Sequence, residues 1–277
     1  SKETYRKIFG KEYYSFDEGD IHYVVLDDVF YYARHYVGYI EESQLEWLEN
    51  DLRDIKPGSK VVIFTHIPTW SREARAGEYG KEEMNKIVGH RRELYRILEP
   101  YDAHLCTAHE HYAENYELSD SLFEHVHAPL SGLFWQSLWS MDGVPWGYYV
   151  YTIKNGDISW YYKAVGQDKS VQYTEYAVGE DRHKPDCIVA NVWNYDPKWQ
   201  VLWYEDGVLQ GEMTKFSGWD TTICNDVDQR REKEFRWKYI GAGETQHLFY
   251  AKPSRPDTKV EIKVIDRFGN VCKPYRY

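Results

Sequence analysis

The sequence predicts an α/β portion followed by a β-rich, sandwich-like C-terminal domain. Up to residue 107, apolar strand-like runs alternate with amphipathic helical segments, which is the order of an α/β layer. From Gly147 onward, short aromatic or β-branched runs are separated by turn signals such as Asn155-Gly156 and Asp206-Gly207. This second pattern is typical of antiparallel β structure.

The α/β portion contains four predicted strands. Residues 13–16 and 21–26 are predicted as two strands joined by the turn Asp17-Glu18-Gly19-Asp20, so we expect a hairpin. Residues 61–65 form a continuous apolar run, which favours a strand buried on both faces. Residues 103–107 form a further short strand.

Two helices are predicted between these strands. Residues 43–55 carry leucine and isoleucine on one face of a helix, which ends at Pro57-Gly58. A second helix is expected over residues 81–98, with a buried side near its end and a stop at Pro100.

The later strands divide the chain. They are predicted at residues 148–153, 158–165, 187–193, 200–204, 247–251 and 260–265. The first two are expected to complete the α/β portion as a hairpin. The polar stretch 166–185 resembles a linker, so we expect domains at residues 1–168 and 169–277.

Composition excludes several functional classes. The net charge of −11 argues against a generic binder of nucleic acid or anionic membrane, because phosphates attract basic surfaces. A phosphate ester remains an acceptable substrate, because bound cations reverse the local sign of charge. No run of 18 apolar residues occurs, so no membrane span is expected.

Three histidines stand where strands end. His66 follows the strand at 61–65, and His109 and His111 follow the strand at 103–107. Ligands of α/β sheets gather beyond the carboxyl ends of strands, and imidazole suits zinc and other transition metals. A histidine in such a position is often structural, but this combination favours a metal site.

These motifs, in their order, resemble the calcineurin-like metallophosphoesterases. The relevant segments are Thr65-His66-Ile67-Pro68 and Ala108-His109-Glu110-His111, with Ala108 where the family carries glycine. The resemblance implies a metal-dependent phosphoric ester hydrolase with two divalent ions, such as Zn, Fe or Mn. It also implies that His66 and His109 bind one ion and that His111 binds the other.

The resemblance continues into the β-rich part. Asn191-Val192-Trp193-Asn194, Trp199-Gln200-Val201 and Asp206-Gly207 are similar to the C-terminal β domain of some bacterial members of the family. Such members are often exported, which suggests a periplasmic or secreted location.

Other motifs of the family have no counterpart at the required positions. The family supplies carboxylates, an asparagine and a catalytic histidine from D-x-H, G-D and G-N-H motifs. Asp20-Ile21-His22 spells D-x-H, but it lies in a turn before a strand rather than after one. The chain is therefore expected to be a C-terminal portion, with its catalytic residues upstream.

We therefore expect metal binding to be weak or absent in this chain alone, and the chain to be inactive by itself. A missing N-terminal segment or another chain would complete the site. An open sheet edge, where that segment would dock, also predicts dimerisation or edge pairing.

A glycine and two aromatic residues are candidates for binding the substrate. Gly132 allows close approach of the backbone, and Phe134 and Trp135 supply an apolar wall. The same residues suit a core between domains, and both interpretations stay open here. The His125 and His127 pair has no supporting ligands nearby and is interpreted as structural.

The alternative function is a non-catalytic binding module for a glycan or a protein partner. It rests on Trp193, Trp199, Trp203 and Trp219 in the β-rich part. Burial of these tryptophans together with convergence of His66, His109 and His111 would favour the hydrolase. Scattered histidines and tryptophans along an exposed groove would favour the module.

Overall fold

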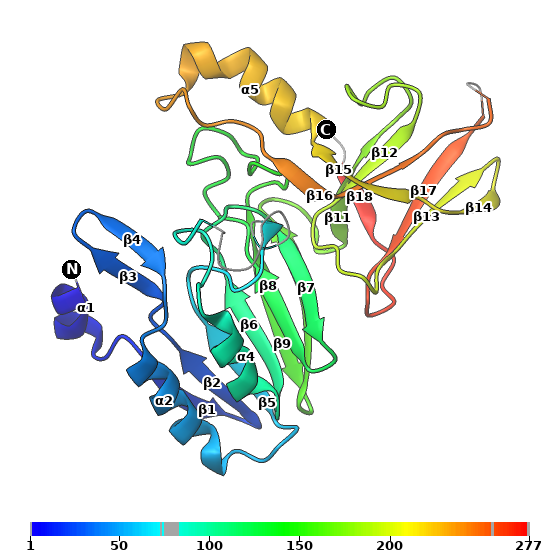
Figure 1. Ribbon diagram of the computed structural model, residues 1–277. Helices are drawn as coiled ribbons and strands as arrows, with labels where there is room; N and C mark the ends of the chain where they lie inside the picture. Colours follow the sequence, from blue (N-terminus) through cyan, green and yellow to red (C-terminus); the bar gives the residue numbers. More distant parts are fainter. Residues whose placement is uncertain (1, 73, 75–82, 256–257, 276–277) are drawn as a thin grey trace. The chain divides into compact units, whose positions relative to one another are not determined.

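The computed structural model describes residues 2–72, 74, 83–255 and 258–275 (Figure 1). The chain forms two compact units, each considered by itself. The first unit comprises the chain up to Glu110 with residues 115–127 and 153–157. The second comprises residues 111–114 and 128–152 and the chain from Ile158 onward. The boundary expected between residues 168 and 169 rests on composition and stays a prediction.

The described elements up to residue 126 include four helical segments and eight strands. They are α1 (Lys2–Phe9), β1 (Tyr14–Glu18), β2 (Ile21–Val25), β3 (Val29–Tyr32), β4 (His35–Gly38), α2 (Glu42–Asp51), the 3₁₀ turn η1 (Leu52–Asp54), β5 (Lys60–Phe64), α4 (Arg91–Leu98), β6 (Asp102–Thr107), β7 (Glu114–Ser119) and β8 (Leu122–Val126).

Six of these strands form one mixed sheet in the order β1-β2-β5-β6-β8-β7. Strands β2, β5, β6 and β8 run parallel to one another, and β1 pairs antiparallel with β2 at the edge. Val61, Ile63 and Leu105 belong to a core that they share with leucines of α2 and α4. Because β5 and β6 are parallel neighbours, the loops that follow them lie at the same edge of the sheet.

The helix predicted over residues 81–98 is wrong at its start. Residues 81 and 82 lie outside the described residues, and α4 begins only at Arg91. The backbone before it pairs elsewhere: Gly38 N–H donates to the Met84 carbonyl at 2.6 Å, and Val88 N–H donates to the Pro68 carbonyl at 3.0 Å. Backbone groups engaged in this way cannot form helical hydrogen bonds.

The described elements from residue 147 onward include ten strands and one long helix. They are β9 (Gly147–Lys154), β10 (Asp157–Ala164), β11 (Val171–Tyr176), β12 (Ile188–Val192), β13 (Gln200–Glu205), β14 (Val208–Glu212), β15 (Thr214–Trp219), α5 (Thr221–Glu234), β16 (Glu244–Ala251), β17 (Val260–Ile265) and β18 (Lys273–Tyr275).

The β-rich prediction for the C-terminal part is confirmed. A five-stranded sheet has the order β15-β16-β12-β11-β18, and a three-stranded sheet has the order β14-β13-β17. Ala190 and Val192 of the first sheet and Val201 and Val264 of the second belong to one buried core. The two sheets therefore bury a common apolar layer.

Two expectations about the middle of the chain are wrong. The polar stretch 166–185 contains β11, a nearly fully buried strand, and is not a linker. Its polar side chains are accommodated by hydrogen bonds: Gln172 donates to the Tyr162 carbonyl at 2.6 Å. The β9–β10 hairpin forms as predicted, with Asn155 and Gly156 both at positive φ, but it makes a two-stranded sheet of its own.

Helix α5 carries little apolar periodicity, which explains why the sequence did not predict it. Asp220 caps its first turn by accepting hydrogen bonds from the N–H groups of Thr222 at 2.9 Å and Ile223 at 3.2 Å. Arg230 pairs along the helix with Asp226 at 3.0 Å and Glu234 at 2.7 Å. Local polar contacts thus support a helix with few buried residues.

Among the described residues, no helix combines the length and apolar character that crossing a bilayer requires.

Candidate metal-binding site

The loop after β5 is held by a buried carboxylate. Asp28 accepts hydrogen bonds from the backbone N–H groups of His66 at 3.0 Å and Ile67 at 2.6 Å, and it is 1% exposed. Burial raises the pKa of Asp28 to about 7, although the hydrogen bonds from His66 and Ile67 oppose this shift. Asp28 therefore fixes the backbone from which the His66 ring projects.

A second buried carboxylate joins the two predicted metal loops. Glu124 of β8 accepts hydrogen bonds from the N–H groups of Thr69 at 2.7 Å and Trp70 at 2.8 Å, and from the Thr107 hydroxyl at 3.0 Å. Burial raises the pKa of Glu124 to about 7. The loop that follows His66 and the strand end that precedes His109 are thereby tied to one side chain.

The structure brings His66 and His109 together. His109 Nδ1 lies 3.0 Å from His66 Nε2, and the ring centroids are 4.8 Å apart. On its other side, His109 Nε2 lies 2.8 Å from the Asn85 carbonyl oxygen, so Nε2 carries the proton and donates. Nδ1 of His109 is then the nitrogen with a lone pair, and it accepts the proton of His66 Nε2.

The spacing of this pair can be compared with that of two ligands of one metal ion. Two nitrogen ligands at about 2.0–2.1 Å from a zinc ion lie roughly 3.3–3.4 Å apart at the tetrahedral angle, farther than the 3.0 Å between His66 Nε2 and His109 Nδ1. A ligating histidine ordinarily donates its second N–H to a carbonyl, as His109 does to Asn85. Burial lowers the pKa of His66, which favours the neutral ring that metals bind.

The backbone is unusual at His109 and His111. Their φ values are 62° and 60°, in the left-handed region that residues other than glycine rarely adopt. Such conformations cost on the order of 1–3 kcal/mol and cluster at functional sites. Glu110 between them is buried, with Oε2 3.7 Å from Arg72 Nε. The loop therefore bends at both histidines, at His109 and again at His111.

His111 belongs to the second unit, where it stacks on an aromatic side chain. Its ring lies 4.3 Å from the Phe134 ring at an interplanar angle of 30°. Phe134 in turn meets Trp237 edge-on at 6.4 Å. The structure thus gives His111 a defined neighbour within its own unit.

The predicted substrate residues form a strained loop. Gly132, Phe134 and Trp135 all have positive φ, at 54°, 50° and 65°. A Cβ on Gly132 would lie 2.4 Å from the Ser137 carbonyl oxygen, so the close approach that Gly132 allows is to its own loop. Leu133 anchors the loop in a core with α5, whereas the Trp135 side chain is 75% exposed.

The other histidines named from the sequence have structural partners. His125 contacts His104 at 3.0 Å and Asn115 at 3.1 Å through its two ring nitrogens. His127 Nδ1 donates to the Thr107 carbonyl at 2.6 Å. His22, of the Asp20-Ile21-His22 triplet, is held in β2 by Asp17 at 2.8 Å and Asp51 at 3.0 Å.

In the part of the chain that the structure describes, no three His, Cys, Asp or Glu side chains are gathered in a way that could hold a metal ion.

Sequence reasoning missed Asp28, Glu124 and Asn85. Asp28 follows the predicted strand at 21–26, and the rule that selected His66 could have found it. Glu124 occupies an interior strand position, where an isolated charge gives no periodic signal. Asn85 contributes only a backbone carbonyl, which any residue could supply.

Comparison with protein families gives one match. Residues 124–272 of the 277, more than half of the chain, match the family model described as the C terminal of calcineurin-like phosphoesterase. A comparison with curated proteins found no match. The matched region includes Gly132, Phe134 and Trp135 and does not reach His66, His109 or His111. The chain thus belongs to the calcineurin-like phosphoesterase family, of which it carries the C-terminal region.

Proposed function

We propose that this chain supplies histidine ligands to a metal-dependent phosphoric ester hydrolase. In this proposal His66 and His109 hold one divalent ion, and His111 holds a second. The mixed sheet of the first unit is part of the α/β sandwich of such an enzyme.

The contact between His66 and His109 carries the proposal. The two facing nitrogens are 3.0 Å apart, so a small separation of the rings would let both bind one ion, and the outer nitrogen of His109 is already fixed by a carbonyl. The nature of the donors supports the proposal, because neutral imidazole binds zinc and iron.

The chain's own residues orient the ligands. Asp28 fixes the backbone at His66, Glu124 fixes the loop that follows it, and the Asn85 carbonyl selects the proton position of His109. When bound, two divalent ions polarise a phosphoryl oxygen and lower the pKa of a bound water. Phe134 and Trp135 offer an apolar wall to the ester's leaving group, with Gly132 shaping their loop.

Histidine alone leaves the charge of two divalent ions uncompensated. The proposal therefore assigns the carboxylate ligands to polypeptide outside these 277 residues, in the same protein or in another chain. In this proposal such polypeptide docks at the β1 edge, where Phe16 is 47% exposed and stacks on Tyr23 at 5.0 Å. Binding of metal by this chain alone is expected to be weak, with little or no turnover.

The tryptophans on which the binding-module alternative rests are mostly buried. Trp193 and Trp199 are buried core residues, and Trp203 packs against the same core as Trp199. Trp219 is exposed by 46%. Since burial was the feature that favours the hydrolase, we do not propose the alternative.

Titration with zinc tests the proposal. The chain and its His66→Ala, His109→Ala and His111→Ala variants are titrated by calorimetry, with the exposed His35→Ala as the matched control. Each ligand variant is expected to weaken zinc binding by roughly tenfold or more, while the control retains it. Equal affinity in all variants would show that zinc binds elsewhere.

A further inference from the structure

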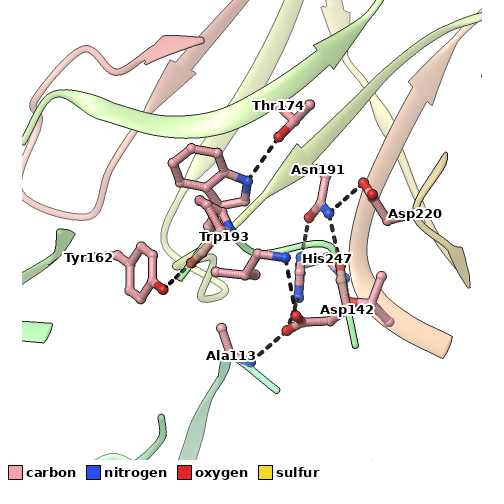
Figure 2. A network of polar contacts seen from close by, with 11 residues as sticks. Ala113, Asp142, Tyr162, Thr174, Asn191, Trp193, Asp220 and His247 are labelled. Carbon is pink, nitrogen blue, oxygen red and sulfur yellow. Dashed lines mark hydrogen bonds and ion pairs between the residues drawn. The ribbon is translucent and has the colours of Figure 1, made fainter. Parts of the chain in front are cut away.

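Four buried polar side chains of the second unit form a continuous network, which we call the buried network: Asp142, His247, Asn191 and Asp220 (Figure 2). Each is at most 4% exposed. They come from a loop, from β16, from β12 and from the residue that caps α5. Polar groups this deeply buried are costly unless they are fully paired, so the network is a specific feature of the fold.

The hydrogen bonds of Asn191 fix the order of donors. Its Nδ2 lies 3.0 Å from the Asp142 backbone carbonyl and 2.8 Å from Asp220 Oδ2, and both of these atoms accept. Its Oδ1 therefore faces His247 Nδ1, at 2.6 Å, and His247 donates there. His247 Nε2 is then directed at the Asp142 carboxylate, at 3.4 Å.

At its far end the network reaches the loop of residues 111–114, which carries His111. Asp142 Oδ2 accepts a hydrogen bond from the Ala113 N–H at 2.7 Å (Figure 2). Ala113 is two residues beyond His111 and is itself buried. The carboxylate therefore acts directly on the backbone of the loop.

Two further contacts hold the same loop. Tyr112, between His111 and Ala113, packs so closely on Gly243 that a Cβ there would lie 2.1 Å from the Tyr112 hydroxyl oxygen. Phe134 stacks on His111 at 4.3 Å. Three consecutive residues of the loop are thus each in contact with a different segment of the second unit.

The loop of Asp142 is fitted just as closely to the helix cap. A Cβ on Gly143 would lie 2.2 Å from the Asp220 carboxyl carbon, and Gly143 has a φ of 79°. Asp142 cannot move without disturbing Asp220, and Asp220 cannot move without disturbing α5. The position of the Asp142 carboxylate is therefore determined by β12, β16 and α5 together.

We propose that the buried network is a positioning device for the loop that carries His111, with Asp142 and His247 as positioning residues. In this proposal the β-rich C-terminal unit orients one of the proposed metal ligands, His111. This inference rests on the proposed function in assigning His111 to a metal; the coupling of the network to the loop does not depend on it.

Amide hydrogen exchange at Ala113 in the full chain without metal tests the coupling. Asp142→Ala removes the acceptor, so exchange at Ala113 is expected to accelerate on the order of tenfold or more. Asp142→Asn keeps a side-chain oxygen and is expected to restore most of the protection. His247→Ala should accelerate exchange at Ala113, and His247→Gln, which keeps a donor, should do so less. The exposed His183→Ala is the control.

Unchanged exchange at Ala113 in both Asp142→Ala and His247→Ala would overturn the inference. Equal acceleration in Asp142→Ala and Asp142→Asn would also overturn it, because loss of the specific acceptor would then not be the cause. Zinc titration of His111→Ala separates the two claims. If His111→Ala leaves zinc affinity unchanged while the Ala113 results hold, the proposed metal role fails and the coupling stands.

Discussion

At the scale of single residues, the site depends on carboxylates that do not themselves face a ligand. Asp28 and Glu124 accept hydrogen bonds from the backbone N–H groups of His66 and of the loop that follows it. Burial raises the pKa of each carboxyl to about 7, because the charged form is disfavoured away from water. The fold tolerates this desolvation, and the two buried groups hold the loops in place. Their role is to reduce the freedom of the histidines.

Removing the Asp28 carboxyl should destabilise the fold. Asp28→Ala leaves the N–H groups of His66 and Ile67 without their acceptor, and we expect a loss of about 2–4 kcal/mol in the free energy of unfolding. Asp28→Asn keeps one oxygen and should lose less. Urea unfolding measures both, with the exposed Asp54→Ala as control. A loss in Asp28→Ala no larger than in the control would contradict the assigned role.

The pKa of Glu124 predicts a pH dependence of stability. Folding raises this pKa from 4.5 to about 7, so the folded state retains a proton that the unfolded state has released between these pH values. The contribution of Glu124 to stability is therefore complete below pH 4.5 and is lost as the pH rises through 7. The loss is on the order of 3 kcal/mol, at about 1.4 kcal/mol for each pKa unit.

Glu124→Gln isolates this contribution, because glutamine does not titrate. The unfolding free energy of the wild type should fall relative to that of the variant as the pH rises from 4.5 to 7. The readout is the slope of this difference with pH, because the hydrogen bonds that glutamine changes alter the unfolding free energy by an amount that does not depend on pH. Parallel pH profiles would show that Glu124 is not protonated in the folded protein.

At the scale of elements, strain is concentrated in the two loops that carry the candidate residues. His109, His111, Phe134 and Trp135 all have positive φ, which is rare outside glycine. Each loop is anchored by a neighbouring side chain, Glu124 at Thr107 for the first and Leu133 in its core for the second. Tertiary contacts therefore maintain conformations that the local sequence does not favour.

The loop of residues 131–139 offers a direct test of this strain. In Gly132→Ala, the new Cβ would meet the Ser137 carbonyl at 2.4 Å, and the φ of 54° is itself unfavourable. In the control Gly156→Ala, φ is also positive but nothing lies within 4 Å. We expect Gly132→Ala to lose about 1–3 kcal/mol more than the control in thermal or urea unfolding. Equal losses would mean that the loop yields without cost.

The sequence predicted strands better than connections. Apolar runs located β5, β6 and β12, because strands buried on both faces leave a continuous apolar signal. It missed β11, whose glutamine and threonine are buried through hydrogen bonds formed only in the folded chain. It also placed a helix before Arg91, where backbone pairing with Gly38 decides the outcome.

At the scale of the whole molecule, sequence reasoning identified the family and not the supports of the site. Order and spacing of His66, His109 and His111 were visible, because they follow predicted strands. The carboxylates that orient them could not be read from the sequence. A side chain that accepts a hydrogen bond from a backbone N–H needs only to lie close to it in the fold, and this leaves no sequence motif. The same applies to His247 and Asn191, which lie far in sequence from the loop that they help to hold.

The chain alone should be a poor enzyme. In the proposed function the carboxylate ligands come from polypeptide outside this chain, so we expect little or no hydrolysis of a generic phosphate ester in excess zinc or manganese. Steady-state assays with p-nitrophenyl phosphate measure this, with His109→Ala as the background. Turnover well above that background would show that the chain contains a complete site.

The most direct test is the anomalous scattering of zinc in crystals of the chain soaked in a zinc salt. The account predicts a zinc peak bonded to both His66 Nε2 and His109 Nδ1, at about 2.0–2.1 Å from each. The His109 Nε2 to Asn85 contact of 2.8 Å should be retained. Zinc bound only at other sites, with His66 and His109 still hydrogen-bonded to each other, would contradict the account.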